Sequence, residues 1–271
     1  MNVAEAEPVT SGTQVVELLS ASTDGNWLVY DSNLHGDADI YRIPTRGGER
    51  ERLTTDPRPE FAPSLSPDGR EVAWHRFVNG ERHLFVKRID SDAEQEILPK
   101  PGDQGVPRWS PDGSSLVAWS HNKERGAVFV IKRHANGRWQ LPAWRLEAGQ
   151  LPVWSPDGRS IAFVLLDGSV QMMSADSGAM RSVYSPRPES GDPLAVFLVW
   201  EDPETIWMMG QSATRQDIWS LPIASGRPRL LVKSDDLRPG LSASFASDGT
   251  HFYFALDERL SNVRWAELKA R

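Results

Sequence analysis

The side chains that could perform chemistry in this 271-residue chain are few and scattered. It contains no cysteine, which excludes disulfide bonds and thiolate metal sites. Its six histidines show no HExxH motif or other spacing typical of metal ligands. The serine segments Gly113–Val117 and Gly158–Ala162 begin like the Gly-x-Ser-x-Gly nucleophile elbow but lack its last glycine. We therefore expect no catalytic residue, no metal and no cofactor.

One acidic segment, His35–Asp39, invites a calcium interpretation. It lacks the alternating ligands and the distal glutamate of a calcium-binding loop. Asp39 also matches Asp217 elsewhere in the chain, in a similar sequence context. We therefore assign turn and capping roles to this segment.

Charge and hydropathy exclude two further classes of partner. The formal net charge is −7 and the isoelectric point is about 5.4, which disfavours nonspecific binding to nucleic acid. No stretch approaches the length of about 18 apolar residues that a membrane span needs. Residues 1–20 lack a basic start followed by an apolar run, so we expect no signal peptide in this chain.

A single turn sequence recurs along the chain and organises it. Ser-Pro-Asp-Gly stands at 66–69, 110–113 and 155–158, and weaker copies stand at 22–25, 201–204 and 246–249. Their aspartates, at 24, 68, 112, 157, 202 and 248, lie 44 to 46 residues apart. Proline presets φ for a tight turn, aspartate bonds its own backbone, and glycine accepts the positive φ that follows. Six evenly spaced turns indicate a repeat protein.

The residues around each turn alternate as strands do. Apolar residues stand four and six positions after every one of the six aspartates, and in five units an aromatic residue stands seventeen positions after. A segment with one apolar face is typical of a strand packed on a core. Each unit is thus a four-stranded meander, and we predict an all-β fold: a six-bladed β-propeller of four-stranded antiparallel blades.

The chain ends suggest how the ring closes. Glu7–Thr10 parallels Glu51–Thr54 at a separation of 44 residues, and the last unit ends after its third strand. We therefore expect the N-terminal strand to complete the last blade, which removes a free sheet edge; a frayed tail is the alternative. The predicted single domain, 1–271, divides into a closing strand and six blades: 1–10, 11–56, 57–100, 101–149, 150–191, 192–236 and 237–271.

The chain has eleven tryptophans, and most of them stand at repeat positions, which predicts packing between blades. Trp139 and Trp144 differ because they lie on the outer strand of the third blade. They either wedge against a neighbouring blade or form an exposed patch. We favour the wedge.

The two faces of the predicted propeller differ in sequence. The Ser-Pro-Asp-Gly turns share one face, here called the turn face, and vary little from blade to blade. The opposite face, here called the loop face, varies in length and charge, as a binding surface does. Its candidate contacts are His35, Asp37, Arg58, Glu60, Arg82, Asp103, Gln104, Arg125, Glu189, Asp192, Asp235, Asp236 and Arg238.

The repeat resembles that of the bacterial TolB-type propellers, a WD-like family. The resemblance rests on Asp39–Tyr41, Gly47–Gly48, Arg52–Thr54, Pro63–Gly69, Pro152–Gly158 and Asp217–Trp219. It implies a six-bladed propeller, protein partners and a periplasmic location. TolB itself carries an N-terminal α/β domain that has no counterpart in this chain, and related propellers accompany peptidase and sensor domains.

The leading hypothesis for function is a non-catalytic, monomeric module that binds a protein or peptide through the loop face and an axial funnel. The alternative is a small-molecule sensor or an enzyme with a polar pocket at the axis. An enzyme would need two or more titratable groups within hydrogen-bond reach of each other.

Overall fold

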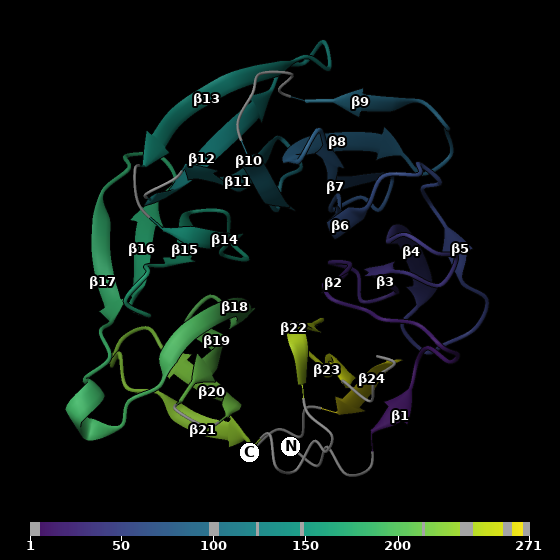
Figure 1. Cartoon of the computed structure of the whole chain (residues 1–271). Helices are drawn as coiled ribbons and strands as arrows, with labels where there is room; N and C mark the ends of the chain where they lie inside the picture. Colours follow the sequence, from purple (N-terminus) through teal and green to yellow (C-terminus); the bar gives the residue numbers. More distant parts are fainter. Residues whose placement is uncertain are drawn as a thin grey trace.

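A computed structural model describes residues 6–97, 103–122, 125–146, 149–212, 215–233, 241–256 and 262–267. Six four-stranded antiparallel sheets surround a central axis as the blades of a propeller (Figure 1). The predicted fold class is confirmed. Within these ranges there is no helix of the length and apolarity that a membrane span requires.

In each blade the first strand lies nearest the axis and the last lies outermost (Figure 1). Blade one contains β2 (Leu19–Ala21), β3 (Trp27–Ser32), β4 (Asp39–Pro44) and β5 (Glu51–Arg52). Blade two contains β6 (Glu60–Leu65), β7 (Glu71–Val78), β8 (Glu81–Arg88) and β9 (Glu94–Glu96). Blade three contains β10 (Asp103–Trp109), β11 (Ser115–Asn122), β12 (Arg125–Arg133) and β13 (Trp139–Leu146).

The other half of the ring repeats this order. Blade four contains β14 (Gln150–Trp154), β15 (Ser160–Val164), β16 (Val170–Ser174) and β17 (Met180–Tyr184). A short 3-10 turn, η2 (Pro188–Ser190), precedes blade five, which contains β18 (Leu194–Asp202), β19 (Thr205–Gln211), β20 (Gln216–Pro222) and β21 (Arg229–Val232). Blade six contains β22 (Leu241–Ser247), β23 (His251–Leu256), β24 (Asn262–Glu267) and, from the other end of the chain, β1 (Glu7–Pro8).

The N-terminal strand closes the ring, as the sequence predicted. In β1, Glu7 pairs with Trp265 of β24, and the two strands lie side by side (Figure 1). The Val9 amide donates to the carbonyl of Val263 at 2.8 Å, and the Val263 amide donates to Thr10 Oγ1 at 2.8 Å. Val9 is also buried in the core between blades six and one. Closure therefore rests on both hydrogen bonds and apolar burial.

The Ser-Pro-Asp-Gly turns owe their shape to their side chains. In blade two, Ser66 Oγ donates to Asp68 at 2.6 Å and accepts from the Glu71 amide at 2.9 Å. Asp68 also accepts from the Arg70 amide at 3.1 Å, and Gly69 has a φ of 69°. The same serine–aspartate bond recurs in blades one, three and four. Each turn is thus fixed locally, which explains why the repeat can be recognised in the sequence.

The tryptophans pack largely as predicted. Trp74 is fully buried, and Trp109 is buried between blades two and three. Trp139 packs against that same cluster, with its ring centroid 5.6 Å from that of Trp109. The wedge prediction is therefore confirmed for Trp139, whereas the side chain of Trp144 lies outside the described part of the structure.

We predict that deleting residues 1–10 lowers the melting temperature by several degrees, because it removes the closing strand and the buried Val9. Each kcal/mol lost corresponds to about 2–4 °C for a chain of this size. Thermal unfolding followed by circular dichroism measures the effect. Glu7→Ala is the control, since its side chain is exposed. An unchanged melting temperature in the deletion variant would contradict a stabilising role for the closing strand.

Candidate functional site

The inner strands of all six blades surround a cavity of about 330 Å³ on the propeller axis. Each blade contributes lining residues, among them Ser20, Leu65, Arg108, Trp154, Trp200 and Phe245. The mouth includes Thr23 and the prolines of three Ser-Pro-Asp-Gly turns, Pro67, Pro111 and Pro156. The cavity therefore opens on the turn face.

The other end of the cavity is closed by bulges in the inner strands. Ala62, Val106 and Leu151 occupy the same repeat position, and all three have φ between 51° and 57°. At each of them the pairing register of the inner strand shifts. A proline follows each, and it disfavours the right-handed helical region for the residue before it. Each of these three residues thus lies in a β-bulge, where one extra residue of the inner strand is left out of the regular pairing.

The side chains at the bulges fill the axis. Leu18 of blade one and Leu151 of blade four come from opposite sides of the ring, yet both pack against the cluster that contains Ala62 and Val106. Val196 of blade five joins Leu18 and Leu151 at a second cluster. We call these five residues the axial plug. The plug makes the cavity a pocket with one mouth instead of a channel.

Buried polar groups hold the bulges in place. Asp31 accepts hydrogen bonds from the amides of Glu17 (3.0 Å), Leu18 (3.1 Å) and Ala62 (3.3 Å). Burial outweighs these hydrogen bonds and raises the pKa of Asp31 to about 7. His75 stands at the same repeat position in blade two and accepts from the Val106 amide at 3.4 Å. Burial lowers the pKa of His75 to about 3, so its ring is neutral.

The cavity contains one interior cation. Arg108 Nη1 donates to the carbonyls of Pro107 (3.2 Å) and Pro63 (3.4 Å), and Arg108 forms no ion pair with any described residue. Burial lowers the pKa of Arg108 to about 10, against the opposing charge of Asp31, so the guanidinium remains protonated at neutral pH. A desolvated, positively charged donor therefore faces the cavity.

Three other blades carry serine where blade three carries Arg108. Ser20 Oγ donates to the Pro63 carbonyl at 3.0 Å, Ser64 Oγ accepts from the Trp109 amide at 3.4 Å, and Ser244 Oγ accepts from the Leu19 amide at 3.0 Å. These serines tie each inner strand to that of the next blade. Arg108 also bonds a neighbouring inner strand, at the Pro63 carbonyl, but it adds a positive charge to the cavity. Comparison of the repeats position by position is the sequence signal that could have identified it.

The mouth of the cavity is acidic. Asp248, one of the six turn aspartates, lines it together with Glu201. Each turn aspartate accepts a backbone amide two residues further along the chain: Asp24, Asp68, Asp112, Asp157, Asp202 and Asp248. The Ser66 hydroxyl holds the pKa of Asp68 below its usual value. Although burial opposes it, hydrogen bonds from Thr250 and Tyr253 lower the pKa of Asp248 to about 2. Asp68 and Asp248 are therefore charged at neutral pH.

A second hollow, of about 460 Å³, lies on the same face between the turns of blades six and one. It shares Thr23 and Asp248 with the axial cavity. Arg46, Tyr253 and Trp265 also line it. The turn face is therefore hollowed at its centre and again at the seam where the ring closes.

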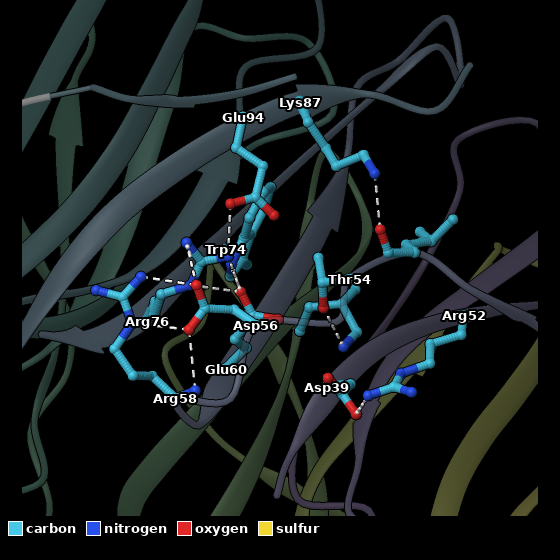
Figure 2. Close-up of polar contacts among 12 residues, drawn as sticks. Asp39, Arg52, Thr54, Asp56, Arg58, Glu60, Trp74, Arg76, Lys87 and Glu94 are labelled. Carbon is cyan, nitrogen blue, oxygen red and sulfur yellow. Dashed lines mark hydrogen bonds and ion pairs between the residues drawn. The ribbon is translucent and has the colours of Figure 1, made fainter. Parts of the chain in front are cut away.

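Glu60, a predicted loop-face contact, is in fact an interior residue. Its side chain is 0% exposed and accepts from Trp74 Nε1 (2.7 Å) and from Arg76 Nε (2.7 Å) (Figure 2). Arg76, which is 2% exposed, also bonds Glu94 at 2.7 Å and approaches Asp56 at 3.3 Å. A group enclosed in this way joins blade strands together, so Glu60 does not contact a partner.

Other loop-face candidates make ion pairs within the chain. Arg58 pairs with Asp56 at 2.7 Å and keeps 46% of its side chain exposed (Figure 2). Arg82 pairs with Asp103 across the seam between blades two and three and lies 4.7 Å from the centre of the Trp119 ring. The structure thus brings Arg82 and Asp103 together, but as a tie between blades.

The remaining candidates are spread over the loop face. His35 Nδ1 lies 2.6 Å from the hydroxyl of Tyr41, Asp192 pairs with Arg187 at 3.0 Å, and Asp37 and Glu189 are exposed. Gln104 is half-buried, and its Oε1 has no hydrogen-bond partner among the described residues. Arg125 begins β12, but its side chain lies outside the described part of the structure, as do Asp235, Asp236 and Arg238.

Comparison with known proteins gives a consistent result. A family model described as the TolB beta propeller domain matches residues 55–266. A protein named TolB homolog from Chlorobium chlorochromatii is 29% identical over 152 residues, which are 55% of this chain and 34% of that protein. Tricorn protease homolog 1 from Streptomyces coelicolor is 28% identical over 253 residues, which are 86% of this chain and 23% of that protein.

Among solved structures, TolB from Acinetobacter baumannii is similar with a TM-score of 0.66 and 19% identity. The match covers 82% of this chain and 55% of that one. At this identity the likeness concerns the fold alone. The chain spans about a quarter to a third of the length of the first curated relatives it matches.

We predict that Arg76→Met lowers the free energy of unfolding by about 3–5 kcal/mol, because it leaves the Glu60 carboxylate buried without its cation. Arg58→Met is the matched control and should cost less than about 1 kcal/mol, because its ion pair is exposed to solvent. Urea denaturation of both variants measures the difference. Equal losses would contradict the interior role of the Glu60–Arg76 pair.

We also predict that the contribution of Asp31 to stability falls as pH rises from about 4 to about 7. Burial raises the pKa of Asp31 from 3.8 to about 7, so the folded state binds an extra proton in this range. The penalty is absent below pH 4 and complete above pH 7, and it amounts to at most about 4 kcal/mol. Asp31→Asn should remove this part of the slope in urea denaturation at several pH values. Identical slopes for parent and variant would contradict the prediction.

Proposed function

The chain belongs to the TolB β-propeller family, and we propose that it is a non-catalytic module that binds a protein or peptide partner. The observation that carries this proposal is the one-mouthed axial cavity, to which all six blades contribute. A concave site built from every repeat is a ready receptacle for an extended segment of a partner. The relatives named TolB favour the same class of function.

The charged groups of the cavity support binding over catalysis. Besides Arg108, the lining includes Glu201 and Asp248. Glu201 accepts from Trp207 Nε1, and Asp248 accepts from Thr250, His251 and Tyr253. Both carboxylates are therefore committed to the fold, whereas acid–base catalysis needs titratable groups free to exchange protons with a substrate.

We further propose that the module works in the periplasm, on the basis of its TolB relatives. Four exposed loop-face residues and the half-buried Asp192 remain proposed contacts for a second region of the partner: His35, Asp37, Arg58, Glu189 and Asp192. Their mixture of charges would steer a partner more than it would hold one.

A second function is favoured by the size of the cavity. Pockets that take small molecules have volumes of roughly 300–1,000 Å³, and the axial cavity, at about 330 Å³, lies at the lower end of that range. A small-molecule sensor is therefore the alternative. The two proposals differ in the ligand: a sensor would bind a small molecule and capture no protein partner.

We predict that Thr23→Arg abolishes capture of the partner. Thr23 is exposed and lines the mouth of the cavity, so a long cationic side chain there obstructs entry. The experiment is crosslinking capture from a native lysate, with the parent protein and the variant compared by mass spectrometry. Asp37→Arg is the matched control, because it adds the same side chain at an exposed position on the loop face.

A protein captured by the parent and by Asp37→Arg, but not by Thr23→Arg, is the expected result. If Asp37→Arg alone fails to capture the protein, the partner binds on the loop face and not at the cavity mouth. If no specific protein is captured while a metabolite mixture raises the melting temperature of the parent, the sensor function replaces the proposed one.

A further inference from the structure

The interior and the mouth of the axial cavity carry opposite charges. Arg108 is the interior cation, and Asp248 and Glu201 are the acidic lining residues nearer the mouth. A ligand that satisfies both must be negatively charged at its inner end and positively charged, or at least not negative, near the mouth. A simple anion meets only the first condition and is repelled by the second.

At the inner end, Arg108 is available to an oxyanion. Its Nη1 uses two long hydrogen bonds to carbonyls, and within the described residues Nε and Nη2 make none. The guanidinium fork matches a carboxylate, which it can bind through two parallel hydrogen bonds. The neighbouring Ser20 and Ser64 are occupied with ties between blades. Arg108 therefore provides the main polar anchor at this depth.

Between Arg108 and the mouth, the walls are apolar. Val153 and Trp154 of blade four and Val199 and Trp200 of blade five line the cavity, and all four are only partly buried. An aromatic or aliphatic side chain placed beside the carboxylate would be removed from water by these walls, which is favourable. The anchor and the walls together fit a carboxylate joined to an apolar group.

We propose that the axial cavity binds the C-terminal end of a polypeptide, with the terminal carboxylate on Arg108. The last, apolar side chain lies against Trp154 and Trp200, and basic residues upstream lie near Asp248 at the mouth. This inference rests on the proposed function and specifies which part of the partner is recognised. A polypeptide terminus supplies the three features in the required order along one extended chain.

Isothermal titration calorimetry with two synthetic peptides tests the proposal. Both have the sequence Lys-Lys-Gly-Gly-Ala-Phe, and they differ only in ending with a free carboxylate or with an amide. We expect the free acid to bind the parent protein at least roughly tenfold more tightly, because a charged hydrogen-bonded pair is lost in the amide. A third peptide, with glutamates in place of the lysines, should bind more weakly, and the difference should shrink in high salt.

Arg108→Gln should abolish the preference for the free acid, so that both peptides bind with similar affinity. Arg159→Gln is the matched control: Arg159 is also an arginine of the turn face, but it is exposed and outside the cavity, and its variant should keep the preference. Thermal unfolding establishes that both variants are folded. If Arg108→Gln does not fold, Arg108→Lys serves instead and should reduce the preference without removing it.

Equal affinities of the acid and the amide for the parent would overturn the proposal, and so would a preference that persists in Arg108→Gln. Absence of binding by all three peptides would also overturn it. These results leave the proposed function standing if the partner is still captured by the parent and lost in Thr23→Arg. Conversely, the peptides could show a preference that depends on Arg108 while no partner is captured. That result would support the carboxylate site and contradict the proposed function.

Discussion

Six inner strands converge on one axis, and the space where they meet must be filled. The chain fills it with bulged residues whose apolar side chains, such as Leu18, Val106 and Leu151, pack against shared clusters. The positive φ of Val106 is costly for a β-branched residue, so the surrounding structure must impose it. Asp31 and His75 do so by accepting the amides that the bulges free. The rest of the central structure depends on this plug.

The plug decides which face of the propeller is concave. Because the axis is closed at the level of the bulges, the remaining space lies between them and the Ser-Pro-Asp-Gly turns. The turns therefore have two roles: they fix the first hairpin of each blade, and they form the mouth of the cavity. Their aspartates, charged because the turn geometry supplies hydrogen-bond donors, give that mouth its negative potential.

The fold was predictable from sequence because its determinants are local. Ser66 and Asp68 build their turn from neighbouring residues, and the pairing of Glu7 with Trp265 follows from a repeat offset visible in the chain. The concave face was not predictable, since it depends on one extra residue in each of the inner strands β6, β10 and β14. Nor was the fate of Glu60, because its partner Arg76 stands opposite it only once the strands are paired in register. A charged residue in a predicted loop cannot be assigned to a binding surface until its partners in the folded chain are known.

In a repeat protein, the residues that recur from unit to unit build the shared architecture. A position at which one unit differs from the others is a candidate for a separate role, such as binding. Ser20, Ser64 and Ser244 are equivalent, and each links its inner strand to the next. Arg108 bonds the inner strand of the neighbouring blade too, but it brings a positive charge whose pKa is lowered by burial and with which no described carboxylate forms an ion pair. A protein of marginal stability retains a desolvated cation at its centre at some cost. That cost is offset when the cation meets an anion that arrives with a partner.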